Sequence, residues 1–155
     1  MDQPAIIERG PYKYVEAGEG EPLLVLHGLF GALSNFKGVF SHFSNRFRVI
    51  IPMLPIYELP MRKTSAKSLS EHIEGFVAEM GLEKVHLLGN SLGGHVGLIF
   101  TKNNLGKVAS LSLTASSGLY ENAFGNSFPR REDKTFIRDK VAVTFYDSKH
   151  ATEEL

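Results

Sequence analysis

The stretch VHLLGNSLGG, residues 85–94, joins a short apolar run to a turn that is rich in glycine. It holds the pattern Gly-x-Ser-x-Gly, with Gly89 and Gly93 two positions before and two after Ser91. A strand that turns abruptly into a helix strains the residue at the turn, and only small residues fit on either side. The stretch therefore predicts that Ser91 is exposed at the edge of a sheet, at the start of a helix, with a strained and often positive φ.

A second glycine turn, HGLFG at residues 27–31, follows another apolar run. A serine that attacks a carbonyl group needs two N–H groups that converge on one oxygen. We expect these donors to be the N–H of Leu92, next to the serine, and the N–H of Leu29, with Phe30 as the second choice. Gly28 lets the backbone approach closely, and His27 is expected to be structural, with hydrogen bonds inside its own loop.

Short apolar runs, typical of buried strands, alternate along the chain with segments whose apolar residues recur at helical spacing. This alternation predicts a doubly wound, mostly parallel α/β sheet. The clearest helix is 68–80, where Ser68 and Glu71 fit a capping box and Gly81 fits the end of the helix. Ligands of such sheets bind beyond the carboxyl ends of the strands, where both glycine turns are expected. The other expected elements are strands at 12–16, 23–26, 47–51, 84–88 and 108–113, and helices near 36–43 and at 91–103.

Taken together, the two glycine turns resemble the α/β-hydrolase superfamily, and HGLFG is most similar to its small carboxylesterases and thioesterases. The resemblance runs over roughly residues 10–115. It implies that Ser91 is the catalytic nucleophile and that Leu29 and Leu92 form the oxyanion hole. The superfamily also holds C–C bond hydrolases, cofactor-free haloperoxidases and dehalogenases, but a dehalogenase would carry Asp at the position of Ser91.

The superfamily's catalytic triad runs in the order Ser, Asp or Glu, then His. Glu121 is a candidate for the acid, while Asp133 and Asp139 belong to a charged segment typical of a solvated helix face. We expect other places for all six histidines: the oxyanion loop for His27, solvent-facing helix positions for His42 and His72, the sheet for His86, helix packing for His95, and a segment without a preceding strand for His150.

The absence of a matching acid and base predicts that the fold is incomplete, lacks its last strands, and takes both groups from sequence beyond residue 155. Residues 1–117 are expected to be the N-terminal part of the hydrolase core, and residues 118–155 the beginning of a cap. An incomplete sheet would leave an unpaired edge after 108–113, through which copies of the chain would associate.

The 155 residues include no Cys, and 17 basic residues balance 17 acidic residues. This composition excludes disulfides, thiolate catalysis and Cys-ligated zinc, and it gives no basic excess for nucleic acid or an anionic membrane. No metal or organic cofactor is expected. Without a signal peptide or an apolar run of membrane-spanning length, we expect a cytoplasmic protein that acts on a small ester-like molecule.

Three functions remain open on this evidence. The first is hydrolysis of a carboxylic ester or thioester through an acyl-enzyme on Ser91. The second is hydrolysis of a C–C bond by the same serine. The third is a non-catalytic module that binds a ligand or a partner, which the strained nucleophile turn disfavours because binding alone does not need it.

Overall fold

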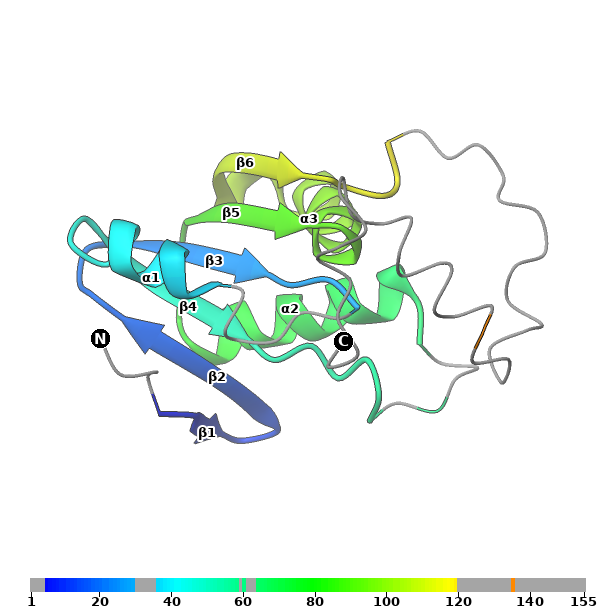
Figure 1. Cartoon of the computed structure of the whole chain (residues 1–155). Coiled ribbons are helices and arrows are strands. Elements are labelled where there is room, and N and C mark those ends of the chain that lie inside the picture. The colour runs from blue at the N-terminus through cyan, green and yellow to red at the C-terminus, as the bar shows by residue number, and fades with distance from the viewer. Residues whose placement is uncertain (1–4, 30–35, 59, 61–63, 120–134, 136–155) are drawn as a thin grey trace. The chain divides into compact units, whose positions relative to one another are not determined.

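The computed structural model describes residues 5–29, 36–58, 60, 64–119 and 135. Residue contacts divide the chain into two units, Met1–Tyr120 and Glu121–Leu155. All the elements named here belong to the first unit (Figure 1). In chain order they are β1 (Ile7–Arg9), β2 (Tyr12–Ala17), β3 (Glu21–Leu26), α1 (Lys37–Phe43), β4 (Phe47–Pro52), α2 (Ala66–Glu79), β5 (Val85–Asn90), α3 (Leu92–Asn103), a short 3-10 helix (Leu105–Lys107) and β6 (Val108–Thr114).

The described strands form one sheet in the order β1-β2-β4-β3-β5-β6. The four strands from β4 to β6 in this order are parallel, whereas β2 runs antiparallel to both β4 and β1. The doubly wound, mostly parallel sheet predicted from the sequence is thus confirmed. The sequence does not predict β1, because its three residues are all exposed and show no alternation of apolar and polar side chains.

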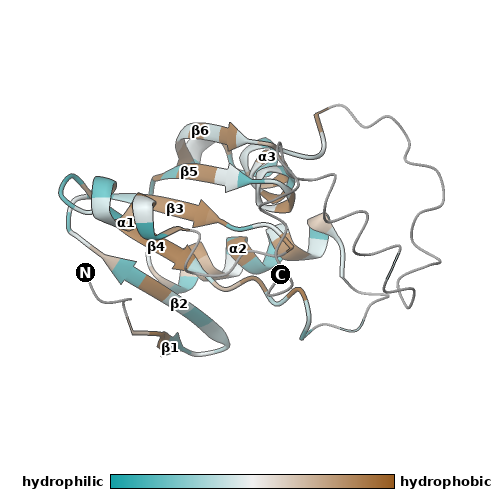
Figure 2. Ribbon diagram, viewed as in Figure 1, coloured by the Kyte–Doolittle hydropathy of each residue, from teal (hydrophilic) through white to brown (hydrophobic). Residues whose placement is uncertain are grey.

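Helices cover both faces of the sheet, and each face has its own apolar core (Figure 1). Helix α1 packs on one face, while α2 and α3 pack against each other on the opposite face. The central strands are apolar along most of their length (Figure 2), as expected of strands that are buried on both faces. The core beneath α1 contains Val15, Leu23, Val25, Phe36, Phe40, Val49 and Ile51.

The N-cap of helix α2 lies three residues earlier than the sequence predicts. Its N-cap is Ser65, whose hydroxyl accepts a hydrogen bond from the N–H of Ser68 at 3.1 Å. The Ser68 hydroxyl in turn accepts from the N–H of Ser65 at 2.9 Å. The capping box predicted for Ser68 and Glu71 is therefore wrong, because Ser68 fills the third helical position of a box that starts at Ser65. The expected end of the helix is confirmed, since Gly81 has a φ of +63° just beyond it.

Strand β6 pairs with β5 and has no second neighbour among the described strands. Every residue of β6 is half-buried or exposed. The unpaired edge expected after 108–113 is thus present in the described part of the chain, while association of copies through it stays a prediction. Phe30, Glu121, Asp133, Asp139, His150 and nearly all of the expected cap at 118–155 lie outside the described residues.

Candidate active site

Ser91 lies at the turn between β5 and α3, where it is the N-cap residue of the helix. Its φ is 53° and its ψ is −119°, so the positive φ expected from the sequence is present. Such a backbone costs a non-glycine residue about 1–3 kcal/mol and persists only where the surrounding structure enforces it. Unlike Ser65 at the start of α2, Ser91 makes no capping hydrogen bond through its hydroxyl. The turn thus leaves the hydroxyl free of the usual structural role of a serine at this position.

The space around the turn explains why small residues flank Ser91. A Cβ on Gly93 would overlap the carbonyl oxygen of Leu26, at the end of β3. A Cβ on Gly89 would lie 2.6 Å from the Cα of Gly94, on the first turn of α3. Helix α3 can therefore approach the ends of both strands only because these positions carry no side chain.

The His-Gly turn after β3 lies directly against Ser91. Parallel pairing sets Leu26 of β3 opposite Gly89 of β5, so both strands end at the same edge of the sheet. A Cβ on Gly28 would lie only 3.0 Å from the Cβ of Ser91. The structure thus brings together two turns that are about 60 residues apart in the sequence.

His27 is held by hydrogen bonds at both ring nitrogens. The N–H of Leu54 donates to Nε2 at 3.0 Å, so Nε2 carries no proton and Nδ1 is the protonated nitrogen. Nδ1 in turn donates to the carbonyl oxygen of Gly28 at 2.9 Å. Burial lowers the pKa of His27 below its ordinary value of 6.5, against a smaller opposing effect of the Gly28 hydrogen bond. The expected structural role is confirmed, although one of its two partners lies outside its own loop.

The two expected oxyanion donors lie on the two turns that meet here. Leu92 is the first residue of α3, so its N–H has no carbonyl partner within the helix. Leu29 follows Gly28 and is exposed. The hydroxyl of Tyr57 donates to the carbonyl oxygen of Leu29 at 2.7 Å. The positive end of the α3 dipole adds a favourable field for a negative oxygen beside Ser91.

The end of β6 and the turn after it fix the backbone of Ser91. The N–H of Ser91 donates to the carbonyl oxygen of Thr114 at 3.0 Å, and its carbonyl oxygen accepts from the N–H of Ser117 at 3.3 Å. The side chain of Asn90 donates to the hydroxyl of Thr114 at 3.0 Å. These contacts were not predicted from the sequence. The rule that ligands bind beyond the carboxyl ends of parallel strands would have indicated this turn as well.

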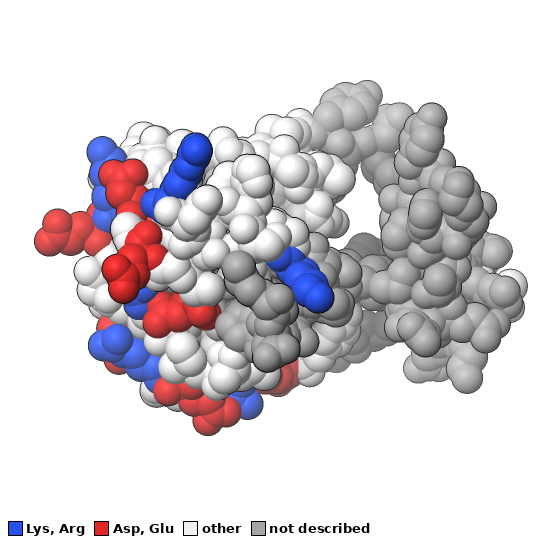
Figure 3. Space-filling model, turned by 60° about the vertical axis from the view of Figure 1, so that its left-hand side comes forward, with Lys and Arg blue, Asp and Glu red and all other residues white. Residues whose placement is uncertain are grey.

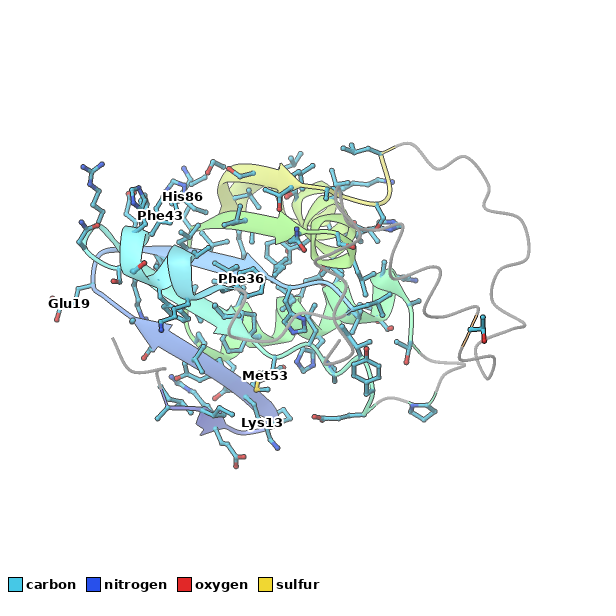
Figure 4. All side chains as sticks on the ribbon, viewed as in Figure 1. Lys13, Glu19, Phe36, Phe43, Met53 and His86 are labelled. Carbon is cyan, nitrogen blue, oxygen red and sulfur yellow. The ribbon has the colours of Figure 1, made fainter. Side chains whose placement is uncertain are left out.

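Among the described histidines, no ring is hydrogen-bonded to the hydroxyl of Ser91, although the backbone N–H of His95 donates to the Ser91 carbonyl oxygen at 3.3 Å. His86 lies near the amino end of β5, beside Phe43 of α1 (Figure 4), and contacts Ser110 at 2.8 Å and Glu21 at 3.2 Å. Four strand residues lie between it and Ser91, and the five residue steps span about 16 Å. These contacts lie beside a pocket of about 150 Å³ lined mainly by apolar side chains. The sheet position expected for His86 is confirmed, and it cannot serve Ser91 as a base.

The remaining described histidines have neighbours of their own. His42 is exposed, as expected. His72 was expected to face solvent but is half-buried, with its ring 4.9 Å from the ring of Tyr12. Burial lowers the pKa of His72, and the nearby Glu58 opposes this effect. The ring of His95 packs against Gly118, in agreement with the expected packing role.

In the described part of the chain, neither the distribution of charged side chains nor the arrangement of His, Asp and Glu indicates a second kind of site, such as a metal centre. On the face drawn in Figure 3, acidic and basic side chains are interspersed, without a large area of one sign. Within the described ranges, no three His, Asp or Glu side chains are grouped so that they could hold a metal ion. Nor does any helix there have the length and apolar character needed to cross a membrane.

The model of a protein family described as the alpha/beta hydrolase fold matches residues 21–148. This range includes both glycine turns and most of the described sheet. The chain belongs to the α/β-hydrolase family. The resemblance inferred from the two turns is therefore confirmed.

Several relatives of this α/β hydrolase have known names. The 2-hydroxy-6-oxo-6-phenylhexa-2,4-dienoate hydrolase of Comamonas testosteroni is 28% identical over 160 residues, which cover 92% of this chain and 56% of the relative. The soluble epoxide hydrolase of a Corynebacterium strain is 32% identical over 120 residues, which cover 75% of this chain and 41% of the relative. The chain thus spans about half the length of these relatives.

A solved structure gives a similar picture. The crystal structure of an alpha/beta hydrolase enzyme from a sediment metagenome of the Mar Chica lagoon in Morocco matches with 39% identity and a TM-score of 0.72. The match covers 95% of this chain and 65% of that chain. A meta-cleavage product hydrolase, at 22% identity, has the same fold with a TM-score of 0.77.

Proposed function

We propose that this α/β hydrolase cleaves a carboxylic ester or thioester through an acyl-enzyme on Ser91. The Oγ of Ser91 attacks the acyl carbon while its proton passes to a general base, and the carbonyl oxygen becomes an oxyanion held by the N–H groups of Leu29 and Leu92. The bond to the leaving group then breaks, and the leaving oxygen or sulfur takes the proton. Water hydrolyses the acyl-enzyme by the same steps and releases the acid.

One observation supports this proposal most strongly: the contact between the Gly28 turn and Ser91, at 3.0 Å for a Cβ on Gly28. This contact gathers a strained serine, a helix start and a second glycine turn at one edge of the sheet. The proposal takes the general base and its acid from outside the described residues. It also treats residues 1–117 as the N-terminal part of the core, with a cap that begins at 118.

Hydrolysis of a C–C bond is the second candidate function. It is favoured by the names of several curated relatives, which are hydrolases of 2-hydroxy-6-oxo-dienoates. These substrates present a ketone carbonyl, so Leu29 and Leu92 would bind the same kind of oxygen. The leaving group would be a carbon that must be protonated as it departs, which requires an acid at a different position.

The test is intact-mass spectrometry after incubation with a fluorophosphonate, a probe that reacts with activated serines, on the protein that carries these residues together with the general base that the proposal places outside them. We expect one adduct on this wild-type protein and none on its Ser91→Ala variant. Ser41→Ala is the matched control, because Ser41 is an exposed serine of α1 whose hydroxyl donates to the nearby Gly38 carbonyl, and it should keep the adduct. A wild-type chain without an adduct would contradict the proposal and favour a non-catalytic module.

Substrates then separate the two candidate reactions. An ester and a thioester with the same acyl group should release acid at rates that vanish in Ser91→Ala. A 2-hydroxy-6-oxo-dienoate should keep its conjugated chromophore if the protein is an esterase and lose it if the protein cleaves C–C bonds. Turnover of the dienoate without turnover of either ester would replace the first proposal by the second.

A further inference from the structure

The loop that follows β4 is bonded to the glycine turn at two points. This loop begins at Met53 (Figure 4) and is anchored by Leu54 and Ile56, whose side chains are buried in the core. The N–H of Leu54 donates to the ring of His27 at 3.0 Å, and the hydroxyl of Tyr57 donates to the carbonyl oxygen of Leu29 at 2.7 Å. One loop therefore contacts the turn both before and after Gly28.

These contacts bear on the direction of the Leu29 N–H. A peptide unit is planar and trans, so its carbonyl and its N–H point in opposite directions. His27 holds the carbonyl of Gly28, which belongs to the same peptide unit as the N–H of Leu29. The hydroxyl of Tyr57 holds the carbonyl of Leu29 itself, which belongs to the next peptide unit along the chain. The backbone of Leu29 is thus fixed on both sides by side-chain hydrogen bonds.

The exposure of Tyr57 argues that its hydrogen bond to Leu29 does not serve to stabilise the apolar core. The residue is 77% exposed, although its neighbours Leu54 and Ile56 are buried. Its ring therefore buries little apolar surface, and an exposed hydrogen bond adds little to the stability of the fold. The position of the Tyr57 hydroxyl is therefore explained by its hydrogen bond to the Leu29 carbonyl.

We infer that Tyr57 is a positioning residue of the oxyanion hole: its hydroxyl holds the Leu29 carbonyl so that the Leu29 N–H points toward the oxyanion formed at Ser91. This inference rests on the proposed function, since it assigns Tyr57 to the same reaction. Tyr57 itself touches neither Ser91 nor the reacting atoms in this assignment. It acts through the backbone of Leu29.

The hydrogen bond can be observed without any activity. Leu29-Phe30 is the only Leu-Phe pair in the sequence, so a chain with ¹³C-carbonyl leucine and ¹⁵N-phenylalanine gives a single HNCO signal, from the Leu29 carbonyl. In Tyr57→Phe this carbonyl should lose its hydrogen bond, and its ¹³C signal should move upfield. An unchanged signal would overturn the inference.

Its effect on the reaction is measured on the full chain as the rate of fluorophosphonate labelling and as ester hydrolysis. Loss of the hydroxyl should slow labelling and lower kcat about tenfold, with KM unchanged, because the N–H is aimed less well at the transition state. The matched control is Tyr12→Phe, which removes a hydroxyl from a ring packed on Phe76 and should react at the wild-type rate. The melting temperature of Tyr57→Phe should stay at the wild-type value.

The outcomes separate the inference from the function on which it rests. A wild-type chain that is never labelled defeats the proposed function, and the role of Tyr57 falls with it. A labelled wild type with an equally fast Tyr57→Phe leaves the function standing and overturns only the role of Tyr57. A higher KM with unchanged kcat would also overturn it, because such a change indicates weaker substrate binding and not a misplaced donor.

Discussion

Single atoms decide the geometry around Ser91, because the glycines beside it leave no room for a Cβ. The tightest of these positions is Gly93, where a Cβ would overlap the carbonyl oxygen of Leu26 and lie 2.7 Å from that of His27. Backbone atoms cannot rotate away as a side chain can, so α3 would have to move off the end of β3. The same movement would carry the Leu92 N–H away from Ser91.

We therefore expect Gly93→Ala to lower the free energy of unfolding by about 3 kcal/mol and to abolish fluorophosphonate labelling. Urea unfolding followed by circular dichroism measures the first effect, and intact mass measures the second.

Gly38→Ala is the control, since Gly38 lies in helix α1 and a Cβ there would meet nothing within 4 Å. The control should raise the unfolding free energy by about 0.5–1 kcal/mol, because alanine favours a helix more than glycine does. A Gly93→Ala protein that is as stable as the wild type would contradict the packing described for α3.

At the scale of elements, α2 shows how a helix start depends on two serines. The hydroxyls of Ser65 and Ser68 each bond to the backbone N–H of the other residue. Ser65→Ala should lower the free energy of unfolding by about 1 kcal/mol, because one N–H at the helix start loses its partner. The midpoint of a urea titration measures this change.

Lys67→Ala is the matched control for this helix start. The side chain of Lys67 is exposed and makes a long ion pair of 3.9 Å with the exposed Glu71, so its loss should change stability by less than about 0.5 kcal/mol. Equal losses in Ser65→Ala and Lys67→Ala would mean that the serine pair does not cap the helix.

Elements with regular apolar spacing were predictable from the sequence, and short or polar ones were not. Leu69, Ile73 and Phe76 recur at helical spacing and are all buried, as the pattern predicts. Strand β1 has no such pattern because it is exposed on both faces. The cap of α2 was misplaced because Ser65 and Ser68 both precede residues of suitable type, and spacing alone cannot choose between them.

The candidate site likewise has a part that the sequence predicts and a part that it does not. The G-x-S-x-G pattern predicts the strained turn, because the steric cause lies within five residues. The contacts of Leu54 and Tyr57 with the other glycine turn come from a loop about 27 residues away in the sequence. No local sequence pattern predicts such contacts, because they depend on the pairing of β4 with β3.

For the whole molecule, two half-buried histidines link stability to pH. Burial lowers the pKa of His27 and of His72 below 6.5, so each stays neutral in the folded state at pH values where the unfolded chain binds a proton. The unfolded state thus binds more protons just below pH 6.5, and stability rises with pH in that window. The contribution is complete above the unfolded pKa and is lost as the pH falls below it toward the folded pKa.

We expect the free energy of unfolding to decrease between about pH 7.5 and about pH 5, as measured by urea titrations at a series of pH values. His27→Gln should reduce the slope of this decrease. His42→Gln, on an exposed residue of α1, should keep the wild-type slope. A stability that does not change over this range would contradict the neutral state assigned to His27 from its two hydrogen bonds.

The positive φ of Ser91 has a consequence for selection. Glycine adopts such a backbone readily, so Ser91→Gly should be more stable than Ser91→Ala, which keeps the strain, by about 1 kcal/mol. A library screened only for heat resistance would therefore enrich glycine at the very position that carries the nucleophile. Sequences kept for their stability alone would drift away from serine here, whereas sequences kept for their chemistry would hold it.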